Sequence, residues 1–307
     1  MRFACTIGVV AVLVASNQTP GPAFGQSRAF RASVDIVALT VTVTDGSRRH
    51  VIDLGADDFA VFEDGRRQEL MFFQQTGVSL SVVLLLDTSA SMQQTLPLAH
   101  EAAIGFSKQL GPNDVASVID FDSSVHVRVG FTNDRFAIEH AIRSTEAGGS
   151  TALYTAVYVA LKGFMHATPP GREREARRQA IILLSDGDDT SSLVEFEEVL
   201  DLAARSDATI YAIGLGTWTL IGTPRSHDTK YVLRRLAEQT GGRAFFPQDG
   251  RELARIYAEI KAELSSQYSL AYQSSNPRRD GQYRRVAVRV DRDGAVARTR
   301  PGYYAPK

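Results

Sequence analysis

The stretch Leu80-Ser-Val-Val-Leu-Leu-Leu86 decides the fold, because it is nearly all apolar and does not alternate with polar residues. A strand that is buried on both faces has this composition, and such strands belong to parallel sheets covered by helices. A polar segment, Asp87-Thr-Ser-Ala-Ser91, follows at once. The sequence therefore predicts a central strand whose carboxyl end carries a polar loop.

The residues that follow repeat this pattern of short apolar runs separated by segments with helical spacing. The apolar runs are residues 115–120, 125–129, 180–184 and 209–213. The segments with helical spacing are residues 95–110, 134–144, 151–165, 193–206, 230–240 and 250–264. Strands that alternate with helices of this length predict an α/β fold with a doubly wound, mostly parallel sheet.

Both flanks of this region are expected to be rich in β-strand. Residues 33–45 alternate between β-branched and polar types, a short strand over 57–65 ends in Asp-Gly, and residues 68–74 resemble a third strand. Residues 267–272 and 283–290 alternate in the same way near the end of the chain. We divide the chain into a β-rich region (26–77), the α/β domain (78–266) and a second β-rich region (267–307), and expect the two β-rich regions to pair.

The N-terminus has the pattern of an export signal. Arg2 precedes a short apolar run, Phe3 to Ala15, and Ala23-Phe24-Gly25 places small residues where a signal peptidase cleaves. We expect residues 1–25 to be a signal peptide and the protein to be exported, to the periplasm or outside the cell. An uncleaved anchor is the alternative. Cleavage would remove the only cysteine, Cys5, so the mature protein would have no disulfide.

The composition excludes several classes of partner. The 307-residue chain has a formal net charge of −1, so neither nucleic acid nor an anionic membrane surface is expected as a partner. After the N-terminal run, no segment approaches the roughly 18 consecutive apolar residues of a membrane span. The six histidines are scattered, which argues against a zinc site built from local spacing.

Three polar segments are expected to meet at one end of the sheet, because open α/β sheets bind ligands outside the carboxyl ends of their strands. The first holds Asp87, Ser89 and Ser91, the second ends at Thr151, and the third contains Asp186. Ser89 and Ser91, two residues apart in a loop taken as extended, are expected to point the same way. Carboxylates and hydroxyls suit Mg²⁺, which takes six oxygen ligands and keeps several waters.

The order Asp-x-Ser-x-Ser, then a Gly-rich Thr, then an Asp after an apolar strand resembles the metal-ion-dependent adhesion site of von Willebrand factor type A domains. The resemblance covers residues 78–266. It implies a Rossmann-like α/β fold, with Ser89, Ser91 and Thr151 touching the metal. It also implies that Asp87 and Asp186 act through water and that a partner's Asp or Glu completes the shell. Mg²⁺ is the expected ion, with Mn²⁺ or Ca²⁺ as alternatives.

The flanks resemble a bacterial subgroup of exported proteins with this domain. The similarity lies in Leu39-x-Val-x-Val-x-Asp45, in Asp58-Phe59-x-Val-x-Glu63-Asp64-Gly65 and in Arg300-x-Gly302-Tyr303-Tyr304. One departure is Thr155, where the family often carries Asp. That position is expected one helical turn from the metal, which leaves the other ligands in place.

Other interpretations of the same motifs are weaker. Asp87 with its serines could simply cap a helix. Asp186-x-Asp188-x-Thr190 with Glu197 resembles a calcium loop, but Ser191 stands where such a loop needs Gly. Asp188 and Asp189 are expected to form a solvated rim around the ion. Gly214-x-Gly216 lacks the third glycine of a dinucleotide-binding motif, and the chain has no P-loop.

A hydrolase is a further alternative, because Gly148-Gly-Ser-Thr-Ala152 is one residue away from a nucleophile elbow. A helix end rather than a strand is expected before it, and His227 lies in a polar loop, so no general base is evident. Trp218 lies in a loop expected on the metal face, where it could be either a partner contact or a buried residue.

The sequence thus predicts an exported, non-enzymatic module that binds a protein partner through an open Mg²⁺ site. Two alternatives stay open. One is a structural component of an envelope assembly in which the metal only stabilises loops, and the other is a metal-dependent hydrolase.

Overall fold

Strand β5 (Leu80–Asp87) lies at the centre of the largest sheet in the computed structural model. The structure describes residues 36–75, 78–166, 177–186, 188–215 and 224–307. The expected signal peptide, Trp218 and the side chain of His227 lie outside these described parts. Asp35–Lys307 forms one compact unit, and all elements below belong to it.

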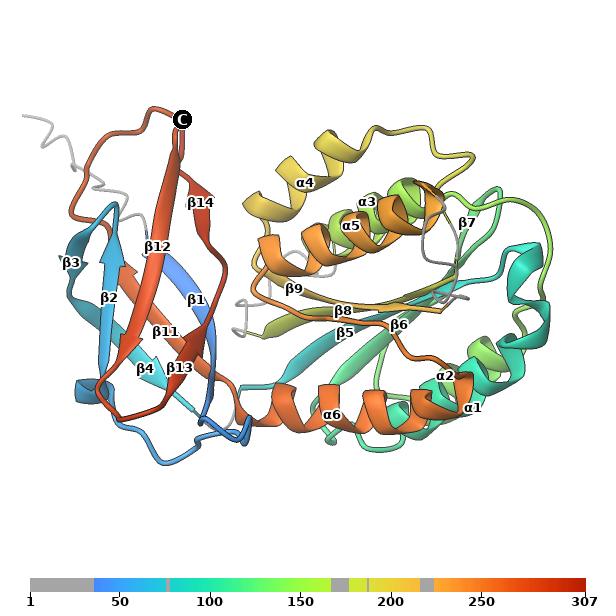
Figure 1. Cartoon of the computed structure of the whole chain (residues 1–307), viewed down its shortest axis with the longest axis horizontal. Coiled ribbons are helices and arrows are strands. Elements are labelled where there is room, and N and C mark those ends of the chain that lie inside the picture. Colours follow the sequence, from blue (N-terminus) through green and yellow to red (C-terminus); the bar gives the residue numbers. More distant parts are fainter. Residues whose placement is uncertain (1–35, 76–77, 167–176, 187, 216–223) are drawn as a thin grey trace, which may run out of the picture. The chain divides into compact units, whose positions relative to one another are not determined.

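Six strands in the order β10-β9-β8-β5-β6-β7 form the central sheet (Figure 1). The other five strands are β6 (Val115–Phe121), β7 (Val125–Thr132), β8 (Arg178–Ser185), β9 (Ala208–Gly214) and β10 (Ala244–Phe245), of which β6 and β8 pair directly with β5. All pairings are parallel except that of β7, which runs antiparallel at the edge. Every residue of β5 is buried, with Val82 and Leu84 in the core on one face and Val83 and Leu85 in the core on the other.

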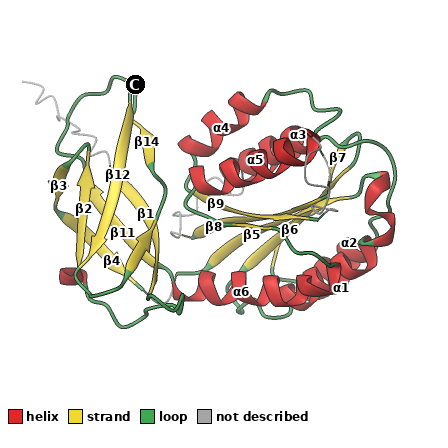
Figure 2. Ribbon diagram, in the orientation of Figure 1, coloured by secondary structure: helices red, strands yellow, loops and turns green. Residues whose placement is uncertain are grey.

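Helices cover both faces of this sheet (Figure 2). On one face lie α1 (Leu96–Ser107), α2 (Arg135–Arg143) and α6 (Leu253–Ser266). On the other lie α3 (Leu153–His166), α4 (Phe196–Arg205) and α5 (Pro224–Gln239). Short 3₁₀ helices span Ala56–Asp58, Ala90–Gln94 and Gly250–Glu252. The prediction of a doubly wound, mostly parallel α/β fold is confirmed.

The remaining strands form a sandwich of two four-stranded sheets, in the orders β13-β1-β11-β4 and β14-β12-β2-β3. The strands are β1 (Ile36–Thr44), β2 (Phe59–Glu63), β3 (Arg66–Gln68), β4 (Leu70–Gln74), β11 (Tyr268–Gln273), β12 (Tyr283–Val290), β13 (Val296–Arg298) and β14 (Gly302–Tyr304). Antiparallel pairing of β1 with β11 and of β2 with β12 joins the two ends of the chain. Alternate residues of β1 and β11 fill the space between the sheets, as their period-two pattern requires.

The strand expected over residues 68–74 is present as β4, but it begins at Leu70. The chain crosses from one sheet to the other at Glu69, so that β3 pairs with β2 while β4 pairs with β11. The alternation of residues identifies extended chain, but it does not say which strand lies beside it.

A buried ion pair lies inside the sandwich. Arg284 Nη1 lies 3.4 Å from Glu63 Oε1, and the two side chains are 4% and 2% exposed. Tyr272 and Tyr303 donate hydroxyl hydrogen bonds of 2.8 and 2.9 Å to Glu63 Oε2. The carboxylate therefore has the partners that a buried charge needs.

A second buried carboxylate ties the sandwich to the α/β part. Tyr211 of β9 donates a 2.6 Å hydrogen bond to Glu263 of α6, and Thr42 of β1 donates one of 3.3 Å to the same side chain. Arg298 of β13 forms an ion pair with it. Among the described residues, no helix has the length and apolar character needed to span a membrane.

Candidate metal centre

Asp87 is the last residue of β5 and is fully buried. Its Oδ1 accepts a 2.8 Å hydrogen bond from the backbone N–H of Ser89, and its Oδ2 accepts one of 2.5 Å from the hydroxyl of Ser185 at the end of β8. Burial raises the pKa of Asp87 to about 6, and the nearby carboxylate of Asp186 contributes to this shift in the same direction. The position therefore favours a neutral group or a carboxylate paired with a cation.

Three side-chain oxygens beside Asp87 form a hydrogen-bonded series that reaches the surface. Ser89 Oγ lies 3.0 Å from Ser91 Oγ, and Ser91 Oγ donates a 2.8 Å hydrogen bond to Asp186 Oδ1. Ser89 is 2% exposed, whereas Ser91 is exposed. Ser91 lies in the 3₁₀ helix that begins at Ala90, so the two serines meet because the chain turns and not because the loop is extended.

Backbone hydrogen bonds fix the glycine-rich segment against this loop. Gly148 N–H donates to Thr88 O at 2.8 Å, and Ala90 N–H donates to Gly149 O at 3.1 Å. Gly149 has φ of 72°, a conformation that other residues rarely adopt. The structure thus holds the segment that ends at Thr151 beside Ser89 and Ser91. The Thr151 side chain is buried.

The segment after Asp186 supports Thr151 and the start of α3. Thr190 Oγ1 accepts a 3.0 Å hydrogen bond from Thr151 N–H, and Thr190 N–H donates one of 2.8 Å to Thr151 O. Asp189 Oδ1 accepts a 3.1 Å bond from the backbone N–H of Tyr154. Asp189 is therefore not a solvated rim residue, because its carboxylate binds the first turn of α3.

Thr155 also belongs to this support. Its hydroxyl accepts a 2.9 Å hydrogen bond from Leu193 N–H, and its own N–H donates to Ser192 Oγ at 2.9 Å. The sequence analysis singles out Thr155 only as a departure from the family pattern and does not predict its hydrogen bonds. The roles of Ser185 and Thr190 are not predicted, and their only signal is their position beside Asp186.

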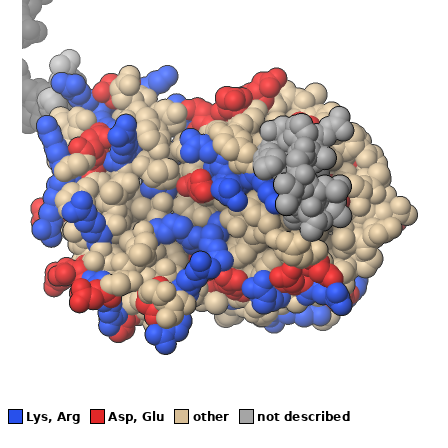
Figure 3. Space-filling model, in the orientation of Figure 1, with Lys and Arg blue, Asp and Glu red and all other residues tan. Residues whose placement is uncertain are grey.

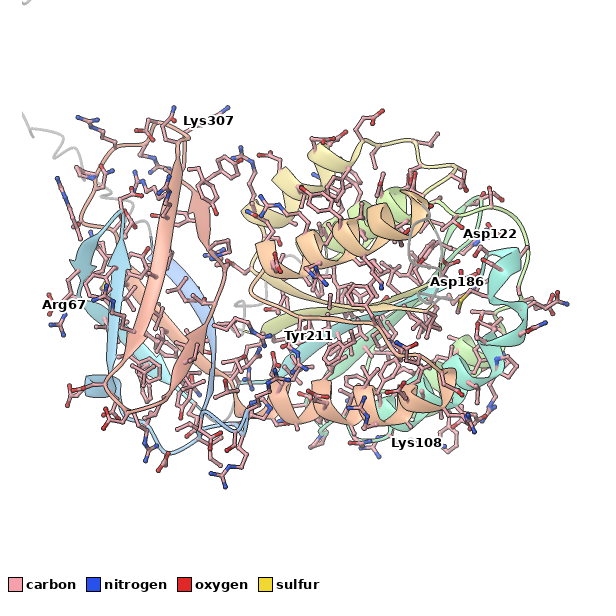
Figure 4. All side chains as sticks on the ribbon, viewed as in Figure 1. Arg67, Lys108, Asp122, Asp186, Tyr211 and Lys307 are labelled. Atoms are coloured by element: carbon pink, nitrogen blue, oxygen red, sulfur yellow. The ribbon has the colours of Figure 1, made fainter. Side chains whose placement is uncertain are left out.

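The centre is acidic. Figure 4 shows Asp122 and Asp186 at the same end of the α/β part, and Asp122 O accepts a 2.7 Å bond from Ala152 N–H. Burial raises the pKa of Asp186 as well. Neither Asp87 nor Asp186 has a Lys or Arg partner in the described parts of the chain. Two partly desolvated carboxylates without a counter-ion are more stable when a cation lies between them.

The donor set fits a hard divalent cation. It consists of two carboxylates and three hydroxyls, and Mg²⁺ prefers oxygen ligands of this kind while using only one or two carboxylates. Among the described residues no group of three or more His, Cys, Asp or Glu side chains could hold a metal ion, so the hydroxyls have to supply ligands beside the two carboxylates. The arrangement could hold an ion through Ser89, Ser91 and Thr151, with Asp87 and Asp186 accepting hydrogen bonds from its waters.

Comparison with known proteins agrees with this fold. The von Willebrand factor type A domain model matches residues 81–259. A UPF0353 protein of Mycobacterium avium is 25% identical over 210 residues, which is 60% of each chain. The chain spans 40% of the length of another curated relative, an uncharacterised protein of Borreliella burgdorferi.

Two solved structures share the fold at low sequence identity. A von Willebrand factor type A protein from Catenulispora acidiphila matches with a TM-score of 0.53 and 16% identity, covering 91% of this chain and 76% of that one. Proximal thread matrix protein 1 from the mussel byssus matches with a TM-score of 0.50 and 18% identity, covering 66% of this chain and 51% of that one. The family model covers more than half of the sequence, and the chain belongs to the von Willebrand factor type A family.

Proposed function

We propose that this protein is an exported binding module that captures a carboxylate of a protein partner at a divalent-cation site. The ion is Mg²⁺, with Mn²⁺ or Ca²⁺ able to replace it. Ser89, Ser91 and Thr151 hold the ion through their hydroxyls, while Asp87 and Asp186 bind it through water. The site is a metal-ion-dependent adhesion site, and the chain is a member of the exported bacterial subgroup that its flanks resemble.

The observation that carries this proposal is the series of hydrogen bonds around the site. Buried Asp87 accepts from the backbone N–H of Ser89, and the hydroxyl of Ser89 contacts that of exposed Ser91, which donates to Asp186. The buried carboxylate of Asp87 favours a cation. The exposed position of Ser91 leaves one side of that cation open to another molecule. An ion held directly by neutral hydroxyls keeps most of its positive charge. An Asp or Glu of a partner is the group that this remaining charge would attract.

A binding role is favoured over catalysis. In the described parts of the chain, the five candidate ligands form hydrogen bonds to hydroxyls, carboxylates and backbone groups, and hydrolysis at the metal would need a general base beside it. The bound ion supplies the attraction for a carboxylate. The protein residues hold the ion in position.

The test is capture of partners from envelope extracts, with Mg²⁺ or with chelator, by the wild-type protein and by Ser89→Ala. Ser265→Ala is the matched control, because Ser265 lies exposed on α6 and bonds only to Lys261 O. A partner that binds with Mg²⁺, is released by chelator and is lost in Ser89→Ala supports the proposal, provided that replacing one of its own Asp or Glu residues abolishes capture.

Retention of the same partner in excess chelator contradicts the proposed mechanism. A large increase in melting temperature with Mg²⁺ but no metal-dependent partner would favour a structural role in an envelope assembly. Turnover of an ester or phosphate substrate that stops in Asp186→Ala would favour a hydrolase.

A further inference from the structure

A cavity of about 780 Å³ lies at the end of the central sheet opposite the candidate metal centre. Its lining includes residues at the amino ends of β5, β8 and β9, and its other wall is the outer face of the sheet β13-β1-β11-β4. A volume of this size is in the range of pockets that hold small organic molecules.

Small side chains keep this space open. On β1 and β11 the residues that face away from the sandwich core and line the cavity include Ala38, Ser269 and Ala271. On the opposite wall, β5 and β9 contribute Ser81 and Ala208. Large side chains at these five positions would fill part of the gap, so the small residues leave room for a ligand between the bulkier residues of the lining.

The lining combines apolar surface with excess positive charge. Phe72 is 46% exposed and stands at the cavity, and Leu161 and Leu202 contribute further apolar wall. Five lining side chains are basic and one, Asp207, is acidic. Basic side chains also gather in the middle of the surface drawn in Figure 3.

Two of the guanidinium groups have unused donors. Arg178 donates from Nη1 to Gln267 O at 3.2 Å and from Nη2 to Val78 O at 3.1 Å. Arg300 donates from Nη2 to Ala38 O at 2.7 Å and from Nη1 to Ser206 O at 3.1 Å, and its Nη1 also lies 3.2 Å from Oδ1 of exposed Asp207. The Nε atoms of both arginines are buried and have no hydrogen-bond partner in the described parts of the chain.

The charge of Arg178 is also poorly compensated. Its guanidinium hydrogen bonds go to backbone carbonyls, and burial lowers its pKa more than the charge of Asp114 raises it. A partly buried guanidinium without a carboxylate in hydrogen-bond contact costs free energy, and an anion at the Nη atoms of Arg178 would reduce that cost.

We propose that this cavity binds an organic anion with an apolar body, for which a medium-chain carboxylate is the simplest example. The anionic group would lie at Arg178 and Arg300, and the apolar body would pack on Phe72, Leu161 and Leu202. An inorganic anion would leave these apolar walls facing water, and a cationic amphiphile would face like charges.

The test is isothermal titration of the full-length protein with decanoate, below its micelle concentration. Decyltrimethylammonium has the same alkyl chain with a positive charge, and inorganic phosphate has negative charge without an alkyl chain. We expect saturable binding of decanoate. Its affinity should fall about tenfold or more in Arg178→Gln, since a charge-assisted hydrogen bond is lost.

A second variant, Ala38→Phe, fills the cavity without removing any hydrogen bond, because Ala38 is an exposed position whose backbone carbonyl is the acceptor for Arg300. It should also weaken decanoate binding about tenfold or more. The matched control is Arg67→Gln, which makes the same charge change in β3, in the other sheet of the sandwich (Figure 4). Melting curves verify that each variant is folded.

The proposal is overturned if decanoate does not saturate a site on the wild-type protein, or if Arg67→Gln weakens binding as much as Arg178→Gln does. Equal affinity for decyltrimethylammonium would contradict the role of the arginines. Equal affinity for phosphate would contradict the role of the apolar walls. Unchanged decanoate affinity in a folded Ala38→Phe would place binding elsewhere.

Discussion

The free energy of unfolding of the metal-free protein should fall as the pH of a metal-stripped buffer rises through about 6, because Asp87 then loses its proton. Burial raises the pKa of Asp87 from 3.8 to about 6, so the folded protein binds more protons at this residue than the unfolded chain between these two pH values. Stability from this group is therefore complete below pH 3.8 and is lost as the pH rises through about 6.

The size of the effect follows from the shift. A change of about 2 pKa units corresponds to roughly 3 kcal/mol at about 1.4 kcal/mol per unit. About 1.4 kcal/mol of this total falls between pH 5 and pH 7.5 by the linkage relation. That is a measurable fraction of the 5–15 kcal/mol typical of a folded domain.

The assay is urea unfolding of the wild-type protein and of Asp87→Asn at pH 5.0, 6.0 and 7.5, without metal and with Mg²⁺. The difference between the two proteins isolates Asp87 from the other carboxylates. Without metal this difference should change by about 1.4 kcal/mol, and Mg²⁺ should remove or reverse the loss at pH 7.5. A difference that is independent of pH without metal, or a pH dependence that Mg²⁺ leaves unaltered, would refute the reasoning.

Three further substitutions test separate parts of the structure. Ser89→Ala should weaken Mg²⁺ binding at least about tenfold in calorimetry, since even outer ligand partners contribute that much. Glu63→Leu should lower the free energy of unfolding by about 3–5 kcal/mol, because it leaves Arg284 buried without its carboxylate. Gly242→Ala should lower it by more than about 3 kcal/mol, because an added Cβ would lie 1.9 Å from Ile210 O.

Each of these has a matched control. Ser265→Ala should leave Mg²⁺ affinity unaltered, and equal losses in both serine variants would show that the effect is not local. Glu69→Leu, at an exposed position, and Gly130→Ala, where a Cβ would meet nothing within 4 Å, should change stability by less than about 0.5 kcal/mol. A stable Glu63→Leu variant would mean that the buried pair contributes little.

The fold class could be predicted because its signal is local. The unbroken apolar run that forms β5 needs helices on both faces, and the later apolar runs and helical segments supply the rest of the sheet. The crossing at Glu69 could not be predicted, since period-two alternation is the same in either sheet. The antiparallel pairing of β7 could not be predicted either, because the composition of a short apolar run does not show whether the strand pairs parallel or antiparallel.

The site was only partly accessible from the sequence. Strand context identified Asp87 and Asp186 as residues at strand ends, but the contact between Ser89 and Ser91 depends on a 3₁₀ helix that an extended loop would not have provided. The binding of Thr151 by Thr190 joins residues 39 positions apart. Such pairs follow from the packing of loops, and no residue spacing encodes them.

The most direct test of the account is a crystal structure of the protein grown with Mn²⁺, with the ion located by its anomalous scattering. We predict one ion within about 2.3 Å of the hydroxyls of Ser89, Ser91 and Thr151, with at least one coordination position taken by water or by a carboxylate from another molecule. No ion at these hydroxyls, or an ion whose whole shell is made of groups from this chain, would contradict the claim of an open metal site.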